Sequence, residues 1–490
     1  MKDYVLLLPV LFPAVAALFT LVIKKQFQNR EFRTMYVGVV LILTLIFNYY
    51  AIFNFKGLTL FYLTQNLPIQ FKVDGLTYLF NSIVTIMWLL AGIFSFEYMK
   101  HEDNNESFYL FYLLTESVLI ALGMAANFMT LYLFYEFMTF LSLPLALHSR
   151  TKEAISGGLK YLFYSVFGAS LALVGFFFMN QYGDITFKAG GTLIAEKVAG
   201  HEGLLLVIFF LTIVGFSAKA GMFPLHGWLP SAHPVAPAPA SAVLSGVITK
   251  AGVLAIIRVI YYQVGVNFLR GTWVQYAFMT LALITIFMGS MMAYKEKVLK
   301  KRLAYSSVSQ VSYVLFGLST MNPIGFIGAL LQVVFHSIAK NLLFMSAGAI
   351  IYKEHKTMVD ELKGIGKNMP ITMWCFTIGG LALVGIPPLT GFVSKWYLAQ
   401  GSLVSGVPTL NNVGPIILLA SALLTAGYLI TISISAFIPG ADFDYKKVKN
   451  TEPNLYMLVP LVILAVACFI FGTFATPLIN FFGGIASTIM

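Results

Sequence analysis

The 490-residue chain is 59% hydrophobic and only 10% charged, with a mean hydropathy of +0.83. This composition excludes a soluble globular domain and predicts an all-α polytopic membrane protein. The two cysteines, Cys375 and Cys468, lie in apolar runs without a Cys-x-x-Cys motif. That pattern argues against a disulfide framework, a metal-thiolate site and an iron–sulfur cluster, so any redox chemistry would belong to a partner.

Apolar runs predict about 14 transmembrane helices, long enough to cross a ~30 Å hydrocarbon core at ~1.5 Å per residue. The first run follows Lys2 without a small-residue cleavage site, so we interpret it as a retained helix rather than a signal peptide. The predicted spans are 4–23, 34–54, 75–98, 107–125, 127–148, 158–180, 204–231, 236–262, 274–293, 303–320, 324–352, 370–403, 412–438 and 455–477.

Basic residues are unequally divided between the two sides of the membrane. Loops after odd-numbered spans hold 20 lysines and arginines, Lys300 and Arg302 among them, whereas the other side holds six. The positive-inside rule therefore predicts a multi-pass protein of the cell membrane with both termini outside. The remaining five basic residues lie within spans. The net charge of +11 therefore arises from loops on one side of the membrane and from residues inside the spans. We therefore expect the chain to contact the lipid bilayer, and we do not expect a nucleic-acid partner.

The seventh and twelfth spans, five helices apart, each contain a lysine, Lys219 and Lys395, together with glycine and proline. An odd repeat length reverses the membrane direction of the second copy, which predicts two inverted five-helix repeats. Glycine and proline predict that helices 7 and 12 are broken. We expect N-terminal helices 1–3 at 1–106, a first repeat of helices 4–8 at 107–262, a second of helices 9–13 at 274–438, and helix 14 with a tail at 455–490.

Ionisable residues inside the spans are the strongest functional signal, because a charge at the bilayer centre costs on the order of 3 kcal/mol. Glu136 is mid-span without a flanking charge, and Lys219 is its natural partner. The two are expected to form a proton switch in which the carboxylate controls the lysine. A static ion pair that joins two helices is the alternative.

The second half of the row follows the same reasoning. Lys250 is interpreted as a relay group, whereas Arg258, two turns further on, is interpreted as a snorkelling or lipid-facing anchor. His336 and Lys340 share one helix face, and the histidine either hands a proton on or joins two helices by a hydrogen bond. Lys395, after the Pro-Pro of the twelfth span, is the candidate outer gate.

Four further polar residues carry less weight. Asp74 is expected to cap a helix or to lie at the membrane interface. Glu116 lies within the fourth span without a basic neighbour, as a protonated carboxyl or a hydrogen-bonded helix contact. His226 and His233 flank the turn at 224–234 and either guide protons inward from one side or order the turn.

The block at 218–246, AKAGMFPLHGWLPSAHPVAPAPASAVLSG, closely resembles the signature of the antiporter-like subunits. That family is shared by respiratory complex I, Mrp-type cation/proton antiporters and membrane-bound hydrogenases, and the resemblance covers nearly the whole chain. It implies fourteen helices with inverted halves. It also implies that Glu136 and Lys219 form a modulating pair, that Lys250, His336 and Lys340 form a central axis, and that Lys395 ends the second half-channel.

The lysine at 395 is similar to the D-type member of Mrp antiporters and unlike the complex I member that has glutamate there. One reading is a subunit that moves H⁺, alone or in exchange for Na⁺, with no catalytic residue, metal or cofactor in this chain. The alternative is the pumping subunit of a hydrogenase or of an NADH- or ferredoxin-linked complex. Partners would be homologous antiporter-like subunits, small membrane subunits and, in the alternative, the redox subunits. A free-standing solute transporter is disfavoured by the single file of lysines.

Overall fold

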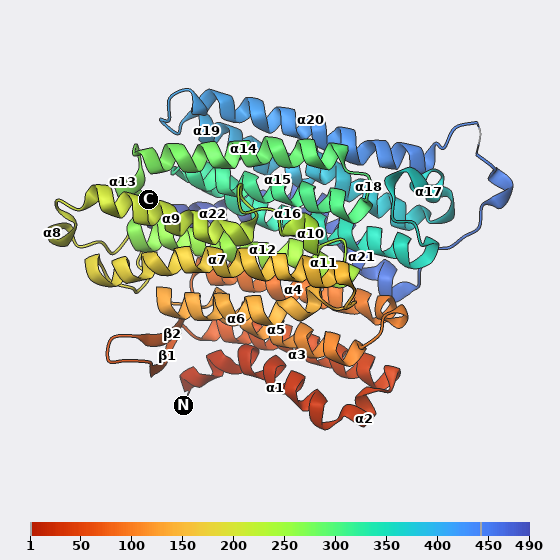
Figure 1. Ribbon diagram of the computed structural model, residues 1–490, viewed down its shortest axis with the longest axis horizontal. Coiled ribbons are helices and arrows are strands. Elements are labelled where there is room, and N and C mark those ends of the chain that lie inside the picture. The colour runs from red at the N-terminus through yellow and green to blue at the C-terminus, as the bar shows by residue number, and fades with distance from the viewer. Residues whose placement is uncertain (1, 442) are drawn as a thin grey trace.

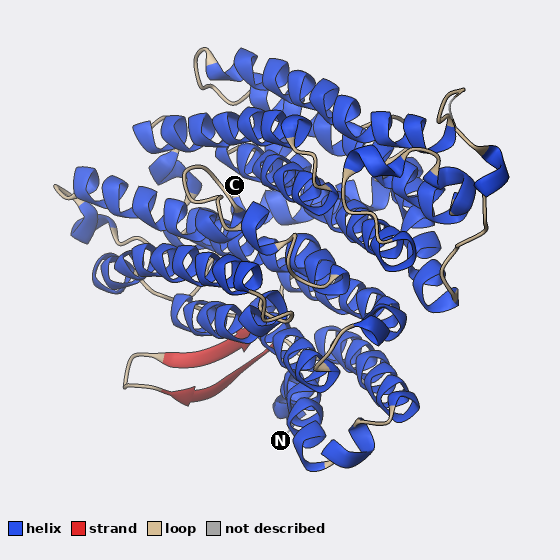
Figure 2. Cartoon of the chain, turned by 45° about the vertical axis from the view of Figure 1, so that its right-hand side comes forward, coloured by secondary structure: helices blue, strands red, loops and turns tan. Residues whose placement is uncertain are grey.

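The computed structural model describes residues 2–441 and 443–490, which form a layered bundle of helices with one β-hairpin (Figures 1 and 2). The hairpin strands are antiparallel, with Gly57 opposite Lys72. The N-terminal part consists of η1 (Lys2–Leu7), α1 (Leu8–Val22), α2 (Lys24–Phe27), α3 (Arg30–Asn54), β1 (Gly57–Tyr62), β2 (Pro68–Lys72), α4 (Gly75–Tyr98) and η2 (Met99–His101).

The middle of the chain contains two short π-helical segments, η3 and η4, that flank α12. Its elements are α5 (Asn105–Gly123), α6 (Phe128–Ala146), α7 (Lys152–Tyr182), α8 (Ala195–Val198), α9 (Glu202–Ala220), α10 (Leu229–Ala232), α11 (Ala238–Val243), η3 (Leu244–Ile248), α12 (Thr249–Ile257) and η4 (Arg258–Val264).

All of the regular secondary-structure elements described after residue 264 are helical. They are α13 (Val266–Leu269), α14 (Trp273–Lys295), α15 (Leu299–Ser319), α16 (Pro323–Glu354), η5 (Val359–Leu362), α17 (Ile365–Asn368), α18 (Pro370–Val384), α19 (Thr390–Leu403), α20 (Leu410–Phe437), η6 (Tyr445–Lys447), α21 (Leu455–Thr473) and α22 (Thr476–Ile489).

Twelve helices among the described residues are long and apolar enough to cross a membrane. The predicted span 303–320 is not one of them, because it coincides with α15, which is rich in serine and begins with three basic residues. The predicted span 370–403 is divided between α18 and α19. The all-α membrane fold is therefore confirmed, whereas the count of fourteen and the inverted repeats stay predictions.

Helices α9 and α18 end at glycines in the left-handed region. Gly221 has a φ of +82° and Gly385 a φ of +90°, values that residues with a side chain rarely adopt. Pro224 follows the first break, and Pro387 and Pro388 follow the second. Proline cannot continue a helix, so the two predicted interruptions occur where the sequence placed them.

The connections gather at two opposite ends of the bundle. Figure 1 shows β1, β2, α8, α13 and both termini at one end, called here the hairpin end, and α2 and α17 at the other, called the basic end. Lys300 and Arg302 were assigned to a loop of the basic end, and that assignment is wrong. They belong to the first turn of α15, with both side chains buried, because their donors satisfy backbone carbonyls of neighbouring segments.

Candidate ion-translocation site

Lys219, near the end of α9, is fully buried, and its ammonium is surrounded by hydroxyl groups. Its Nζ donates to Thr139 Oγ1 at 3.0 Å, to Tyr161 Oη at 2.9 Å and to Ser165 Oγ at 2.8 Å. It also lies 4.2 Å from the centre of the Tyr161 ring. Close packing of α7 on α9 makes this possible, because a Cβ at Gly168 would lie 2.4 Å from the carbonyl oxygen of Gly215.

Glu136 is half-buried on α6 and does not form with Lys219 the static ion pair that was the alternative to a proton switch. No nitrogen–oxygen distance of 4.0 Å or less joins the two among the described residues. Thr139 follows Glu136 by three residues, so the carboxylate lies about one helical turn from a hydroxyl that binds the lysine. The ion pair is open in this structure, since three hydroxyl acceptors already satisfy the ammonium.

Lys250 and His336 are brought together across α12 and α16. The lysine Nζ lies 2.6 Å from His336 Nδ1 and donates to the carbonyl of Ser245 at 2.6 Å. Ser245 belongs to the π-helical segment η3, a kind of local widening that is common at functional sites. His336 Nε2 has no hydrogen-bond partner among the described residues. The histidine therefore contacts Lys250 rather than Lys340, although it shares a helix with Lys340.

Lys340 is directed instead at α15. Its Nζ donates to Ser306 Oγ at 2.8 Å and to the carbonyl of Leu303 at 2.9 Å. Ser306 also accepts a hydrogen bond from Tyr428 on α20 at 2.9 Å, and the Tyr428 hydroxyl lies 3.3 Å from that of Thr425. A chain of hydroxyl groups thus extends from Lys340 toward the last helices of the bundle.

Lys395, on α19, caps the broken end of α18. Its Nζ donates to the carbonyls of Leu383 and Val384 at 2.6 and 2.7 Å, which are free because α18 ends there. It also lies 5.2 Å from the centre of the Tyr313 ring. The lysine therefore lies beside the interruption predicted for the twelfth span.

Of the two histidines predicted to guide protons, His226 is half-buried and His233 is fully buried. His226 leaves Nδ1 without a partner, and His233 leaves both ring nitrogens without one among the described residues. The His233 ring stacks on Phe344, with ring centres 4.9 Å apart. His233 is placed against the helix that carries Lys340, whereas His226 remains in the turn.

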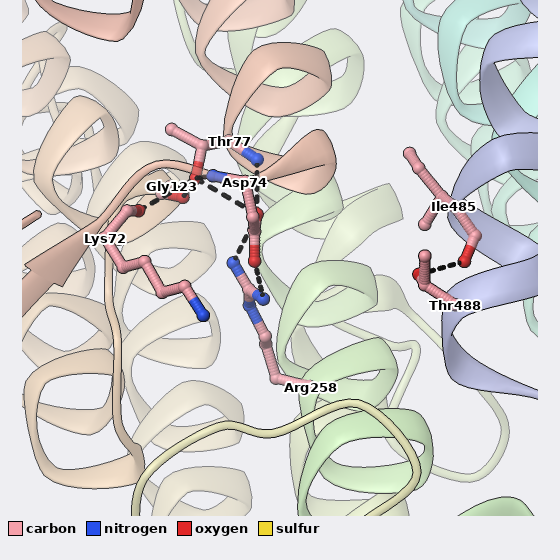
Figure 3. Close-up of polar contacts among 7 residues, drawn as sticks. All are labelled: Lys72, Asp74, Thr77, Gly123, Arg258, Ile485 and Thr488. Carbon is pink, nitrogen blue, oxygen red and sulfur yellow. Dashed lines mark hydrogen bonds and ion pairs between the residues drawn. The ribbon is translucent and has the colours of Figure 1, made fainter. Parts of the chain in front are cut away.

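Arg258 is not a lipid-facing anchor, and that expectation is wrong. Its side chain is 2% exposed and forms a two-pronged ion pair with Asp74, at 2.5 and 3.0 Å (Figure 3). Asp74 also caps α4 by accepting from the backbone N–H of Thr77, as predicted for a cap. The guanidinium turns inward because this carboxylate lies inside the bundle at the hairpin end.

Glu116 is buried on α5, and neither carboxylate oxygen has a hydrogen-bond partner among the described residues. Within the described part of the chain, Glu116 therefore does not make the hydrogen-bonded helix contact that was one of its two interpretations. No group of three histidine, cysteine, aspartate or glutamate side chains that could hold a metal ion occurs within the described part of the chain.

Sequence reasoning found the charged groups but missed the hydroxyl groups that bind them. Tyr161 and Ser165 are four residues apart on α7, and Ser306 begins the serine-rich stretch of α15. Repeated hydroxyl residues inside a predicted span were the available signal. Which lysine each would meet depends on contacts between helices far apart in the sequence.

A polytopic helical bundle with buried lysines and broken helices defines a class of ion-translocating membrane subunits. Residues 125–425 match the family described as NADH:quinone oxidoreductase/Mrp antiporter, and residues 62–109 match the N-terminal part of complex I chain 5. The chain belongs to this antiporter-like family, which confirms the resemblance seen in the sequence. It is an antiporter-like membrane subunit.

Three relatives illustrate the breadth of the family. The N-type component of the NADH-quinone oxidoreductase of Desulforudis audaxviator is 29% identical, over 84% of this chain and 83% of its own. The D-type component of the Na(+)/H(+) antiporter of Alkalihalophilus pseudofirmus is 28% identical over 99% and 97%. Hydrogenase-4 component B of Escherichia coli is 30% identical over 87% of this chain, which spans 64% of that relative.

The fold itself is shared with a chain in the solved structure of the Mrp complex from Dietzia sp. DQ12-45-1b. The TM-score is 0.86 at 19% identity, with 100% of this chain and 98% of that chain covered. These relatives are subunits of multisubunit complexes that contain other membrane subunits.

Proposed function

We propose that this chain carries protons across the cell membrane along Glu136, Lys219, Lys250, His336, Lys340 and Lys395. One observation carries the proposal. The lysines donate to hydroxyl, carbonyl or imidazole acceptors, and none of the four forms an ion pair with a carboxylate among the described residues. An ammonium without a fixed counter-charge is suited to giving up a proton.

In this scheme Glu136 controls the first step. When the Glu136 carboxylate lies close to Lys219, it stabilises the charged form of the lysine. When the carboxylate moves away, that stabilisation is lost and Lys219 can release its proton. The proton then passes to Lys250 and His336, on to Lys340, and leaves near Lys395. His226 and His233 assist uptake at the basic end, which we place in the cytoplasm, with both termini outside.

The relay falls within the two segments at 107–262 and 274–438, which we propose to be inverted repeats. The breaks after α9 and α18, next to Lys219 and Lys395, support that arrangement. Sodium would be exchanged for protons if the complex is of the Mrp type, in line with the match to the D-type component of an Na(+)/H(+) antiporter.

A second candidate is the pumping subunit of a redox-driven complex. The matches to the N-type component of an NADH-quinone oxidoreductase and to a hydrogenase-4 component favour it. The redox chemistry would then lie in partner subunits. Purification of the intact complex separates the two functions, because flavin or iron–sulfur absorbance accompanies only the redox-driven assembly.

The test of the relay is Lys219→Ala in membrane vesicles that hold the assembled complex, with a pH-sensitive dye as the readout. We expect proton movement by the complex to fall to background, since no neighbouring side chain can replace the ammonium among Thr139, Tyr161 and Ser165. Lys160→Ala is the matched control, because that lysine is exposed on α7. Proton movement that survives in the Lys219 variant would refute the relay.

A further inference from the structure

A polar cavity opens at the basic end, outside the lysine row. It encloses about 180 Å³, enough for several water molecules at ~30 Å³ each. Its walls come from the turn after α4, the turn between α10 and α11, the start of α15 and the end of α16. Glu102 and Lys300 are its charged residues.

Lys300 ties this cavity to the segment that follows His233. Its side chain is only 5% exposed, and its Nζ donates to the carbonyl of Pro234 at 3.1 Å and to the carbonyl of Ala236. Both carbonyls belong to residues that line the cavity. The ammonium therefore holds the part of the cavity wall that directly follows His233 in the chain.

Glu102 supplies an acidic group to the wall of the same cavity. It is half-buried, and no ion pair within 4.0 Å joins it to Lys300 among the described residues. Burial raises the pKa of the Glu102 carboxyl; the positive charge of Lys300 opposes this rise and the negative charge of Asp103 adds to it. A carboxyl of this kind holds a proton at higher pH than an exposed glutamate does.

His233, the residue before Pro234, is a buried polar group without a hydrogen-bond partner among the described residues. Both ring nitrogens lack partners among the described residues, although burial of an imidazole without them is costly. Its ring stacks on Phe344, and Lys340 Nζ lies 6.0 Å from the centre of that same ring. The histidine thus shares an aromatic neighbour with Lys340, and it directly precedes Pro234 of the cavity wall in the chain.

We propose that the cavity between Glu102 and Lys300 is the entrance through which protons reach His233 and then Lys340. Glu102 collects the proton, water in the cavity carries it past the Pro234 and Ala236 carbonyls, and His233 accepts it. Lys300 is a positioning residue that holds those carbonyls in place. This proposal rests on the proton relay proposed above. It supplies Lys340 with protons from the basic end, in a cycle that still requires the switch formed by Glu136 and Lys219.

The first test compares Glu102→Gln with Asp103→Asn in vesicles that hold the complex. Each removes one acidic group from the same turn, and only Glu102 lines the cavity. We expect proton movement to fall about tenfold in Glu102→Gln and to recover in Glu102→Asp. It should change by less than about twofold in Asp103→Asn, because Asp103 does not line the cavity and acts on the Glu102 carboxyl only through its charge. Equal rates in the Gln variant and the wild type, with Lys219→Ala inactive, would overturn the entrance and leave the relay intact. An active Lys219→Ala would instead overturn the relay.

The second test measures access directly and does not depend on turnover. Val235→Cys places a thiol on the cavity wall, in a chain whose own Cys375 and Cys468 are buried. We expect a membrane-impermeant, cationic thiol reagent to label it from the basic end, and to label it more slowly in Glu102→Gln because the acidic group is gone. A thiol that stays unlabelled, while one at exposed His101 reacts, would show that the cavity is closed and overturn the proposal.

Discussion

Buried positive charges in this protein have two kinds of partner. Arg258 is neutralised by Asp74 through two short contacts, whereas Lys219 donates only to hydroxyl groups. A guanidinium keeps its proton and matches a carboxylate in two places, so that pair is structural. A lysine held by neutral acceptors can exchange its proton. The partner, more than the depth of burial, distinguishes the structural Arg258 from the lysines of the proposed relay.

The structural role of the Asp74 pair can be tested with Asp74→Asn. The change leaves Arg258 buried without a counter-charge, so we expect a loss of about 3–5 kcal/mol in the free energy of unfolding. Asp184→Asn is the control, because its pair with Lys188 is exposed and contributes at most about 1 kcal/mol. Thermal unfolding in detergent measures both. Similar losses in the two variants would contradict the structural role.

Among the elements, α7 and α9 set the geometry around Lys219. Their backbones approach where Gly168 faces Gly215, and this contact brings Tyr161 and Ser165 to the ammonium. Small residues allow such approaches between helices in membranes, where packing replaces the hydrophobic effect. The proposed relay would therefore depend on residues that carry no charge.

Gly168→Ala tests this contact. The new Cβ would lie 2.4 Å from the Gly215 carbonyl and 2.6 Å from Ala218 Cβ, so the two helices must separate. We expect a loss of about 1–3 kcal/mol in stability, together with slower proton movement. Gly203→Ala is the control, because an added Cβ there meets nothing within 4 Å. Equal melting temperatures for the two variants would rule out a tight α7–α9 contact.

For the whole molecule, the sequence was enough to predict the membrane class, most helix positions, both helix breaks and the family. Burial cost alone singles out Lys219, Lys250 and Lys340, because such residues stand out in an apolar run. The inward turn of Arg258 and the pairing of Lys250 with His336 could not be predicted. Both depend on which helices meet, and local periodicity does not encode that.

The orientation of the molecule is a separate prediction. A thiol placed at exposed Lys25 lies at the basic end, and one at exposed Lys197 lies at the hairpin end. Because the basic end is expected in the cytoplasm, an impermeant thiol reagent added to intact cells should label only Lys197→Cys. Inside-out vesicles should give the opposite pattern. Labelling of Lys25→Cys in intact cells would reverse the assigned orientation.

The contact of Lys395 with the end of α18 has a mechanical consequence. Its ammonium donates to the carbonyls of Leu383 and Val384. In the proposed relay, the proton on Lys395 would therefore also strengthen the contact between two half-helices. A neutral amine attracts those carbonyls less strongly, so loss of the proton from Lys395 would weaken the contact between α18 and α19. Linkage then works in both directions. If a neighbouring subunit separated α18 from α19, Lys395 would bind its proton less tightly and release it. Conversely, protonation of Lys395 would favour the closed contact and so exert a force on that neighbour.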